Sequence, residues 1–185
     1  MKINRSLIKS NLIEPLEKEA DLIRAIKTIR NNFTVERDKI GDYCLNPQLV
    51  SAYSLFYLIT NLPKFPFIFH QLPLNIKERF QYYDFIDFGT GPGTYLLSHF
   101  LTIEDFKGHY YGVDNSSLMR KQANKLLTAF GLKQDQFSLV EEISEISFDN
   151  ENKKILFFGN SFNEIEIKLF KKIIAKVHPD IIFFL

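Results

Sequence analysis

The chain has 185 residues, of which 45% are hydrophobic, and a formal net charge of +1 at pH 7, so it fits one large domain or one domain with a small appendage. The balanced charge excludes a global electrostatic footprint for nucleic acid, and no apolar run reaches the roughly 18–20 residues that cross a bilayer. The single cysteine, Cys44, excludes an intrachain disulfide and a zinc ribbon, and the polar N-terminus has no secretory leader, so we expect a cytoplasmic protein.

Residues 1–80 have the pattern of helices. Pro15 suits the first turn of a helix whose apolar positions keep one face, namely Leu16, Ile23, Ile26 and Ile29. Residues 45–63, LNPQLVSAYSLFYLITNLP, predict a second helix, which Asn46 caps and Pro47 starts. Residues 64–73, KFPFIFHQLP, are interrupted by two prolines and predict an apolar connector whose phenylalanines belong to the core.

Beyond residue 80, short apolar runs alternate with helical patterns. The predicted strands are 83–89, 110–114, 137–142, 153–160 and 180–185, and the predicted helices are 94–102, 117–131 and 164–177. Continuous apolar strands separated by helices indicate a parallel sheet covered on both faces. We therefore expect an α/β fold with an open, doubly wound, mainly parallel, Rossmann-like sheet. The expected division is an N-terminal helical segment, 1–80, and a ligand-binding domain, 81–185.

The stretch DFIDFGTGPGTYLLSHF, residues 84–100, holds three of the chain's eight glycines, Gly89, Gly91 and Gly93. Glycine permits positive φ and lets a ligand approach the backbone closely, here at the carboxyl end of the first predicted strand. The dinucleotide fingerprint G-x-G-x-x-G does not match this spacing, and the lysine of a Walker loop is absent.

An S-adenosylmethionine (SAM) pattern fits better. Asp87 precedes the glycines as in D-x-G-x-G-x-G, and Asp114 ends the second strand, where a carboxylate can accept hydrogen bonds from both ribose hydroxyls. The alternative is turn chemistry at the glycines and a simple helix cap at Asp114-Asn115-Ser116. A cofactor fold that has lost binding is a further alternative.

These residues resemble a class I SAM-dependent methyltransferase. DFGTGPGT, GVDNSSLMRKQA, NPQLVSAYSLFYLITNLPKF, ILFFGNSFNEI and PDIIFFL resemble, more narrowly, the methyltransferase-like family that assembles the small ribosomal subunit in mitochondria and bacteria. The resemblance covers residues 45–185. It implies SAM as cofactor and the small subunit or its rRNA as partner.

In this interpretation the cofactor-binding residues are Asp87, Gly89, Thr90, Gly91, Gly93, Asp114, Asn115, Ser116 and Asn160. Asn163 and Glu164, after the fourth strand, are candidates for the substrate side, although they can equally cap the next helix. The scattered histidines have no metal-ligand spacing, so no metal site is expected, and no catalytic residue can be named.

The chain stops at Leu185, where members of the resembled family continue with a Glu-Pro-Gly turn, further strands and usually a metal-binding cysteine cluster. Residues 181–185 would then form an apolar edge strand, which is an aggregation liability. We expect a missing C-terminal segment, or a partner, to cover it.

Three functions remain open from the sequence. The first is a SAM-binding protein of small-subunit assembly, with or without rRNA methylation. The second is a small-molecule methyltransferase whose N-terminal helices form a lid, and the third is a non-catalytic binding module on the same fold. The methyl acceptor and the oligomeric state cannot be inferred from the sequence.

Overall fold

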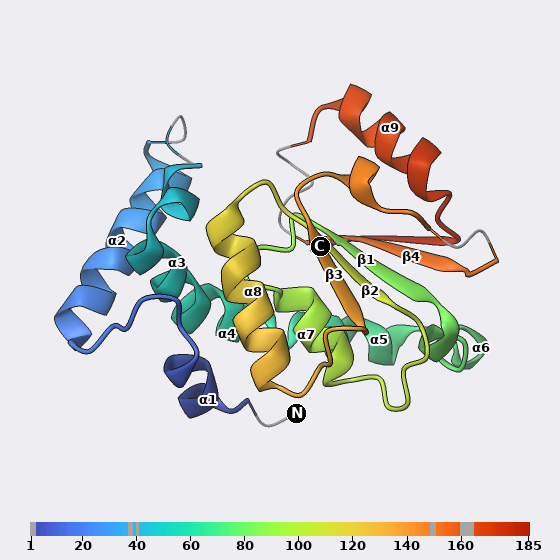
Figure 1. Cartoon of the computed structure of the whole chain (residues 1–185), viewed down its shortest axis with the longest axis horizontal. Coiled ribbons are helices and arrows are strands. Elements are labelled where there is room, and N and C mark those ends of the chain that lie inside the picture. The colour runs from blue at the N-terminus through green and yellow to red at the C-terminus, as the bar shows by residue number, and fades with distance from the viewer. Residues whose placement is uncertain (1–2, 37–38, 40, 149–150, 160–164) are drawn as a thin grey trace.

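The computed structural model describes residues 3–36, 39, 41–148, 151–159 and 165–185, and its centre is a five-stranded sheet in the order β3-β2-β1-β4-β5 (Figure 1). Every strand pair is parallel. In register, Asp87 of β1 lies opposite Gly112 of β2 on one side and Phe157 of β4 on the other. The predicted open, doubly wound α/β fold is confirmed.

The strands are β1 (Asp84–Phe88), β2 (Tyr110–Val113), β3 (Phe137–Val140), β4 (Lys154–Phe158) and β5 (Ile181–Phe184). The helices of the sheet region are α7 (Thr94–Phe100), α8 (Ser117–Ala129) and α9 (Ile167–Val177). The upstream helices are α1 (Arg5–Ser10), α2 (Glu19–Thr34), α3 (Pro47–Tyr53), α4 (Ile59–Asn61), α5 (Lys64–Gln71) and α6 (Leu74–Lys77). Short turns are η2 (Asp42–Leu45), η3 (Ser54–Leu58, π-helical), η4 (Phe80–Tyr82) and η5 (Ile143–Glu145).

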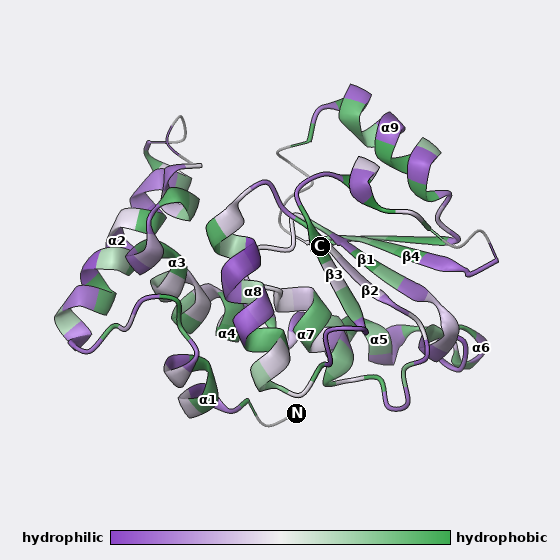
Figure 2. Ribbon diagram, viewed as in Figure 1, coloured by the Kyte–Doolittle hydropathy of each residue, from purple (hydrophilic) through white to green (hydrophobic). Residues whose placement is uncertain are grey.

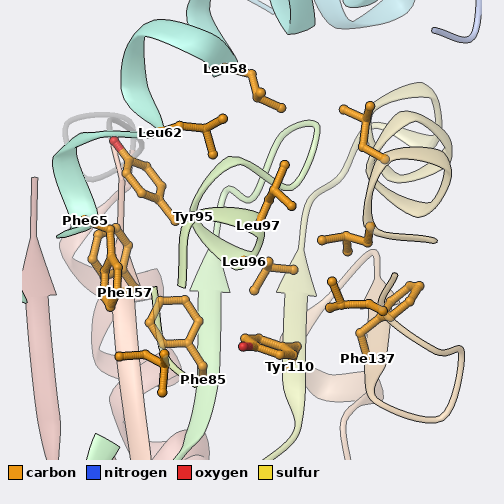
Figure 3. Close-up of a cluster of buried hydrophobic side chains, with 14 of the residues drawn as sticks. Leu58, Leu62, Phe65, Phe85, Tyr95, Leu96, Leu97, Tyr110, Phe137 and Phe157 are labelled. Atoms are coloured by element: carbon orange, nitrogen blue, oxygen red, sulfur yellow. The ribbon is translucent and has the colours of Figure 1, made fainter. Parts of the chain in front are cut away.

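Side chains alternate between the two faces of the sheet, and each face has its own core. On one face Phe85 and Phe157 pack with residues of α4, α5, α7 and α8, including Phe65 (Figure 3). On the other face Ile86 and Leu156 pack beneath α9. Hydrophobic and hydrophilic bands alternate along α8 and α9, as expected for helices with one buried face (Figure 2).

The N-terminal helices are bound to α8 by polar contacts as well as by packing. The fully buried side chain of Gln122 accepts a hydrogen bond from the Ile13 N–H (2.8 Å) and donates one to the Asn11 carbonyl (2.9 Å). The Lys125 ammonium donates to the Leu12 carbonyl at 2.6 Å. The segment before α2 is therefore fixed along the helix that follows β2. The boundary near residue 80 between two units stays a prediction.

The prediction for residues 64–73 was wrong. Residues 64–71 form α5 rather than an irregular connector, and Pro66 stands in its first turn, where a backbone N–H has no partner inside the helix. The expectation that its phenylalanines are core residues holds in part, since Phe65 is buried and Phe67 is 70% exposed. The first predicted helix starts later than expected, at Glu19 rather than Pro15.

Other local predictions are confirmed. Asn46 caps α3, because its Oδ1 accepts hydrogen bonds from the N–H groups of Gln48 (2.9 Å) and Leu49 (3.3 Å). Gly131, just past the end of α8, has a φ of +104°. Within the described residues β5 pairs with β4 and with no other strand. No helix in this part of the chain is long and apolar enough to cross a membrane.

Candidate functional site

The glycine turn joins β1 to α7 at the carboxyl edge of the sheet. Gly89, Gly91 and Gly93 have φ angles of 72°, 54° and 82°, a region that other L-residues rarely occupy. A Cβ on Gly91 would meet no atom within 4 Å, so that side of the turn is open. A Cβ on Gly93 would lie 3.3 Å from the Cβ of Ala123, so this third glycine allows α7 and α8 to pack closely.

The backbone N–H groups of the turn already have acceptors inside the protein. Those of Gly89 and Thr90 donate to the Val113 carbonyl (2.8 and 3.0 Å), and that of Gly93 donates to the Thr90 carbonyl (3.0 Å). The Gly91 N–H donates to Asp114 Oδ2 at 2.8 Å. A phosphate-binding loop needs such N–H groups for its ligand. This turn instead offers a close backbone approach and the carboxylates beside it.

Asp114 follows β2 and joins the two loops of the site. Its Oδ2 accepts from Gly91, and its Oδ1 accepts from the Ser116 N–H at 2.9 Å. Burial raises the pKa of this carboxyl group, while the two N–H donors and the Arg120 guanidinium act in the opposite direction. A carboxylate has about four lone-pair positions. Asp114 can therefore hold the two loops together and still accept hydrogen bonds from a diol.

Asp87 is fully buried at the end of β1. Its Oδ2 accepts a hydrogen bond from the Thr90 hydroxyl at 2.8 Å, whereas its Oδ1 has no partner. Burial raises the pKa of Asp87 to about 7, the hydrogen bond from the Thr90 hydroxyl opposes the rise, the charge of Asp114 adds to it, and the Tyr95 backbone N–H opposes it. The carboxyl group is thus poised to ionise when a cation reaches it.

The N-terminal segment borders this site. Ser116 is the N-cap of α8, its Oγ accepting from the Met119 N–H at 3.2 Å, and the same hydroxyl donates to the Cys44 carbonyl at 2.8 Å. Residue 44 belongs to η2, just before α3. On the other side, the Ser98 hydroxyl of α7 donates to the Leu62 carbonyl. Residues 44–62 are therefore attached to the helices on both sides of the glycine turn.

A hollow of about 440 Å³ lies next to Asp114, past the end of β3. Leu139 and Val140 contribute its apolar wall, and an ion pair between Arg120 and Glu141 (3.0 Å) closes one side. Another hollow of about 460 Å³ lies at the opposite edge of the sheet and is lined by Lys154, Asp180 and their neighbours. Ligands of open α/β sheets bind at the carboxyl edge, so we place the site at the first hollow and the glycine turn.

The predicted site residues that the structure describes lie close together, but their side chains make different kinds of contact. The Thr90 side chain faces inward and supports Asp87, and Ser116 is both a helix cap and a link to η2. Asn115 is exposed beside them. The predicted residues Asn160, Asn163 and Glu164 lie outside the described residues. None of these assignments is tested by the geometry alone, and they stay predictions.

Two residues beside the site were missed by sequence reasoning. Arg120 donates through its guanidinium to the Asp114 carbonyl and pairs with Glu141. Tyr95 follows the glycine turn in α7, and its buried hydroxyl has no partner in the described part of the chain. The position of Tyr95 next to GPGT was a signal that the sequence did contain. Among the residues that the structure describes, no group of three or more His, Cys, Asp or Glu side chains could hold a metal ion.

Comparison with solved structures finds methyltransferases. An O-methyltransferase family protein from Burkholderia thailandensis superposes with a TM-score of 0.58 at 11% identity, covering 89% of this chain and 51% of that chain. The pyocyanin biosynthetic protein PhzM gives a TM-score of 0.53 at 14% identity over 90% and 52%. A riboflavin-derivative dimethyltransferase, RosA from Streptomyces davawensis, gives 0.52 at 12% identity over 85% and 45%.

No family model and no curated protein matches this chain. It spans about half the length of the three solved proteins above. At these identities the comparisons establish the fold. They do not support the narrower resemblance to the ribosomal assembly family. The strand order, the parallel pairing and the flanking helices together give this chain the Rossmann-like fold of class I methyltransferases.

Proposed function

We propose that this chain binds S-adenosylmethionine at the glycine turn and transfers its methyl group to a small-molecule acceptor. One observation carries the cofactor half of the proposal. The N–H groups of the turn are already used within the protein, while two carboxyl groups flank it, the fully buried Asp87 and the half-buried Asp114. A ligand for this turn has no need of a phosphate, but it presents hydroxyls and a cation to Asp114 and Asp87. Adenosine linked to a methionine end has these features.

The parts of the site suit the parts of that cofactor. Asp114 is placed to accept the ribose hydroxyls, and the hollow beside Leu139 and Val140 suits a flat base. The unpartnered Oδ1 of Asp87 suits the methionine ammonium. SAM would supply an activated methyl group on a sulfonium. The acceptor oxygen or nitrogen would form a bond to that carbon as the carbon–sulfur bond breaks, S-adenosylhomocysteine would leave, and the acceptor's proton would pass to solvent. Because the methyl group is already activated, positioning the two reactants supplies much of the catalysis.

The acceptor class is the less constrained half of the proposal. The three solved proteins described above include an O-methyltransferase family protein and a riboflavin-derivative dimethyltransferase. Residues 44–62 border the glycine turn, where an acceptor would enter. These two observations favour a small molecule held between the N-terminal helices and the cofactor. A role in small-subunit assembly or rRNA methylation stays a prediction that no comparison supports.

Titration calorimetry with SAM and S-adenosylhomocysteine tests the cofactor site. We expect saturable binding by the wild-type chain and none with NAD. Replacing Asp114 with alanine should weaken binding roughly 100-fold, because a charged acceptor of two hydrogen bonds is lost. Lys121→Ala, an exposed change on α8, should leave the affinity unchanged. A ligand at about 100 times its Kd should also add about 2.7 kcal/mol to the stability of the fold.

A folded wild-type chain that binds neither compound would contradict the cofactor assignment. If binding holds, transfer of a radiolabelled methyl group from SAM to phenolic and amine acceptors tests the second half. Small ribosomal subunits and their rRNA serve as the competing substrates. Methylation of the RNA without any small-molecule product would overturn the proposed acceptor class.

A further inference from the structure

Two buried polar atoms beside the glycine turn have no hydrogen-bond partner among the residues that the structure describes. They are Oδ1 of Asp87 and the hydroxyl of Tyr95. Asp87 is fully buried and Tyr95 is 4% exposed. Leaving a buried donor or acceptor unpaired is costly, so most such atoms in folded proteins are satisfied. Two of them on neighbouring residues of one site point to a missing ligand.

Asp87 and Tyr95 are held next to each other by the first turn of α7. The Tyr95 backbone N–H lowers the pKa of the Asp87 carboxyl, and the charge of Asp87 adds to burial in raising the pKa of the Tyr95 hydroxyl. The ring of Tyr95 packs on Phe157, at 4.6 Å between centroids. Phe157 is the register partner of Asp87 on β4. Both unpartnered atoms therefore belong to the same end of β1 and β4.

The ring of Tyr95 has a fixed place. A Cβ on Gly159, at the end of β4, would lie 2.2 Å from a ring carbon of Tyr95, so the ring fills the space that a side chain there would need. Figure 3 shows the Tyr95 ring reaching past the ends of the strands, with its hydroxyl on the side of the N-terminal helices. The hydroxyl thus lies between the end of β4 and the N-terminal helices. This is the side of the glycine turn away from Asp114.

The two groups have complementary chemistry. An ionised Asp87 accepts hydrogen bonds, whereas the Tyr95 hydroxyl stays protonated at neutral pH because burial and the charge of Asp87 raise its pKa, so it can donate one. An α-amino acid end carries an ammonium and a carboxylate on one carbon. The ammonium requires an acceptor and the carboxylate requires a donor. Both protein atoms are shielded from solvent without a ligand, so binding needs a local rearrangement of the groups that cover them.

We infer that Tyr95 is a cofactor-positioning residue, whose hydroxyl binds the carboxylate at the methionine end while Asp87 binds the ammonium beside it. This inference rests on the proposed SAM site and adds the residue that recognises its amino-acid end. Asp114 and the hollow beside β3 recognise the other end, so the two ends of the cofactor are bound by separate groups. Their contributions can be measured separately.

The test compares two ligands on one variant. S-adenosylhomocysteine carries the amino-acid end, and 5′-methylthioadenosine lacks it while keeping the base, ribose and sulfur. We expect Tyr95→Phe to weaken binding of S-adenosylhomocysteine about tenfold, the loss of one hydrogen bond to a charged group, and to leave 5′-methylthioadenosine unchanged. Tyr82→Phe makes the same chemical change at a 59% exposed position and should alter neither affinity.

Each outcome separates this inference from the proposed function. Unchanged affinity of Tyr95→Phe for both ligands overturns the role of Tyr95, and the SAM site survives. An equal loss of both ligands also overturns it, because the tyrosine then acts only on the structure of the site. Wild-type protein that binds neither ligand removes the SAM site itself. The variant loses only an unpartnered hydroxyl, so its thermal midpoint should equal or exceed that of the wild type.

Discussion

Replacing Phe85 with alanine is expected to destabilise the fold by about 3–5 kcal/mol, the usual cost of removing a large buried ring. Phe85 is fully buried on β1, and its ring contacts those of His99, Phe157 and Phe65, at centroid distances of 4.3, 5.6 and 5.8 Å. These neighbours come from α7, β4 and α5. The cavity left by the substitution is lined by three separate elements, so a shift of one of them cannot fill it. Most of the free-energy cost of the cavity should therefore remain.

Urea unfolding followed by far-UV circular dichroism measures this effect. Folded proteins of this kind have about 5–15 kcal/mol of stability, so the variant should be close to the limit of folding. Phe67→Ala provides the matched control, since this ring lies on α5 and is 70% exposed. Its free energy of unfolding should change by no more than about 0.5 kcal/mol. Similar losses in the two variants would mean that α5 presents a different face to the sheet.

The strands of the sheet were predictable because each one is visible in its own segment of sequence as a short apolar run. Runs such as ILFFG in residues 155–159 are apolar on both faces, as buried parallel strands must be. The prediction for residues 64–73 failed because it treated both prolines as interruptions of regular structure. Pro66 stands in the first turn of α5, where its ring is tolerated, and Pro73 precedes α6. The position of a proline within a helix depends on where the helix begins, which the local sequence did not fix.

The order of the strands could not be read from the residues. Strand β1 pairs with β4, which follows it by about 70 positions along the chain, and with β2 on its other side. The sequence of an apolar strand does not indicate which other strand pairs with it when the strands have similar compositions. The order is set by which helices cover which face, an effect of the whole fold.

Part of the candidate site was predictable from the sequence, and part of it was not. Asp87, the glycines and Asp114 follow strand ends, so their spacing was enough to group them. The link from Ser116 to the Cys44 carbonyl joins residues 72 positions apart. The environment of Tyr95 depends on Gly159 and Phe157, which come from β4 and its end. Neither contact has a sequence pattern, because each depends on tertiary packing.

Replacing Asp87 with asparagine is expected to stabilise the ligand-free protein above pH 7, although the same change removes a residue of the proposed site. Burial raises the pKa of Asp87 to about 7 in the folded chain, against about 3.9 when unfolded. Between these values the folded state keeps a proton that the unfolded state has lost. The stability contributed by Asp87 is therefore fully present below pH 4 and lost as pH rises toward 7.

The free energy of unfolding of Asp87→Asn, relative to wild type, should rise by about 1.4 kcal/mol per pH unit from pH 4 to pH 7. Asparagine keeps an oxygen for the Thr90 hydroxyl and cannot ionise. Urea unfolding at pH 4.5, 5.5, 6.5 and 8 measures the trend. A difference that stays constant with pH would show that Asp87 is already ionised in the ligand-free protein.

His99 provides a comparison of opposite sign. Burial lowers the pKa of this histidine to about 3, and its Nδ1 lies 2.9 Å from the Tyr110 hydroxyl. The unfolded chain takes up a proton near pH 6.5 that the folded chain refuses, so the contribution of His99 is lost as pH falls from 6.5 toward 3. His99→Gln should therefore gain stability relative to wild type as pH falls, whereas Asp87→Asn gains as pH rises. Two variants with the same trend would exclude burial as the common cause.

Burying His99 and burying Asp87 both cost stability, but only Asp87 is placed to bind the proposed cofactor. His99 lies among Phe65, Phe85 and Phe106, so replacing this neutral side chain should change stability alone. Asp87 lies in the proposed cofactor site, so Asp87→Asn should be more stable at pH 8 and bind S-adenosylhomocysteine at least tenfold more weakly, because a charge-assisted hydrogen bond is lost. Binding-site residues often lower the stability of the fold while they raise the affinity for the ligand. A variant that gains stability and keeps full affinity would place the methionine end elsewhere.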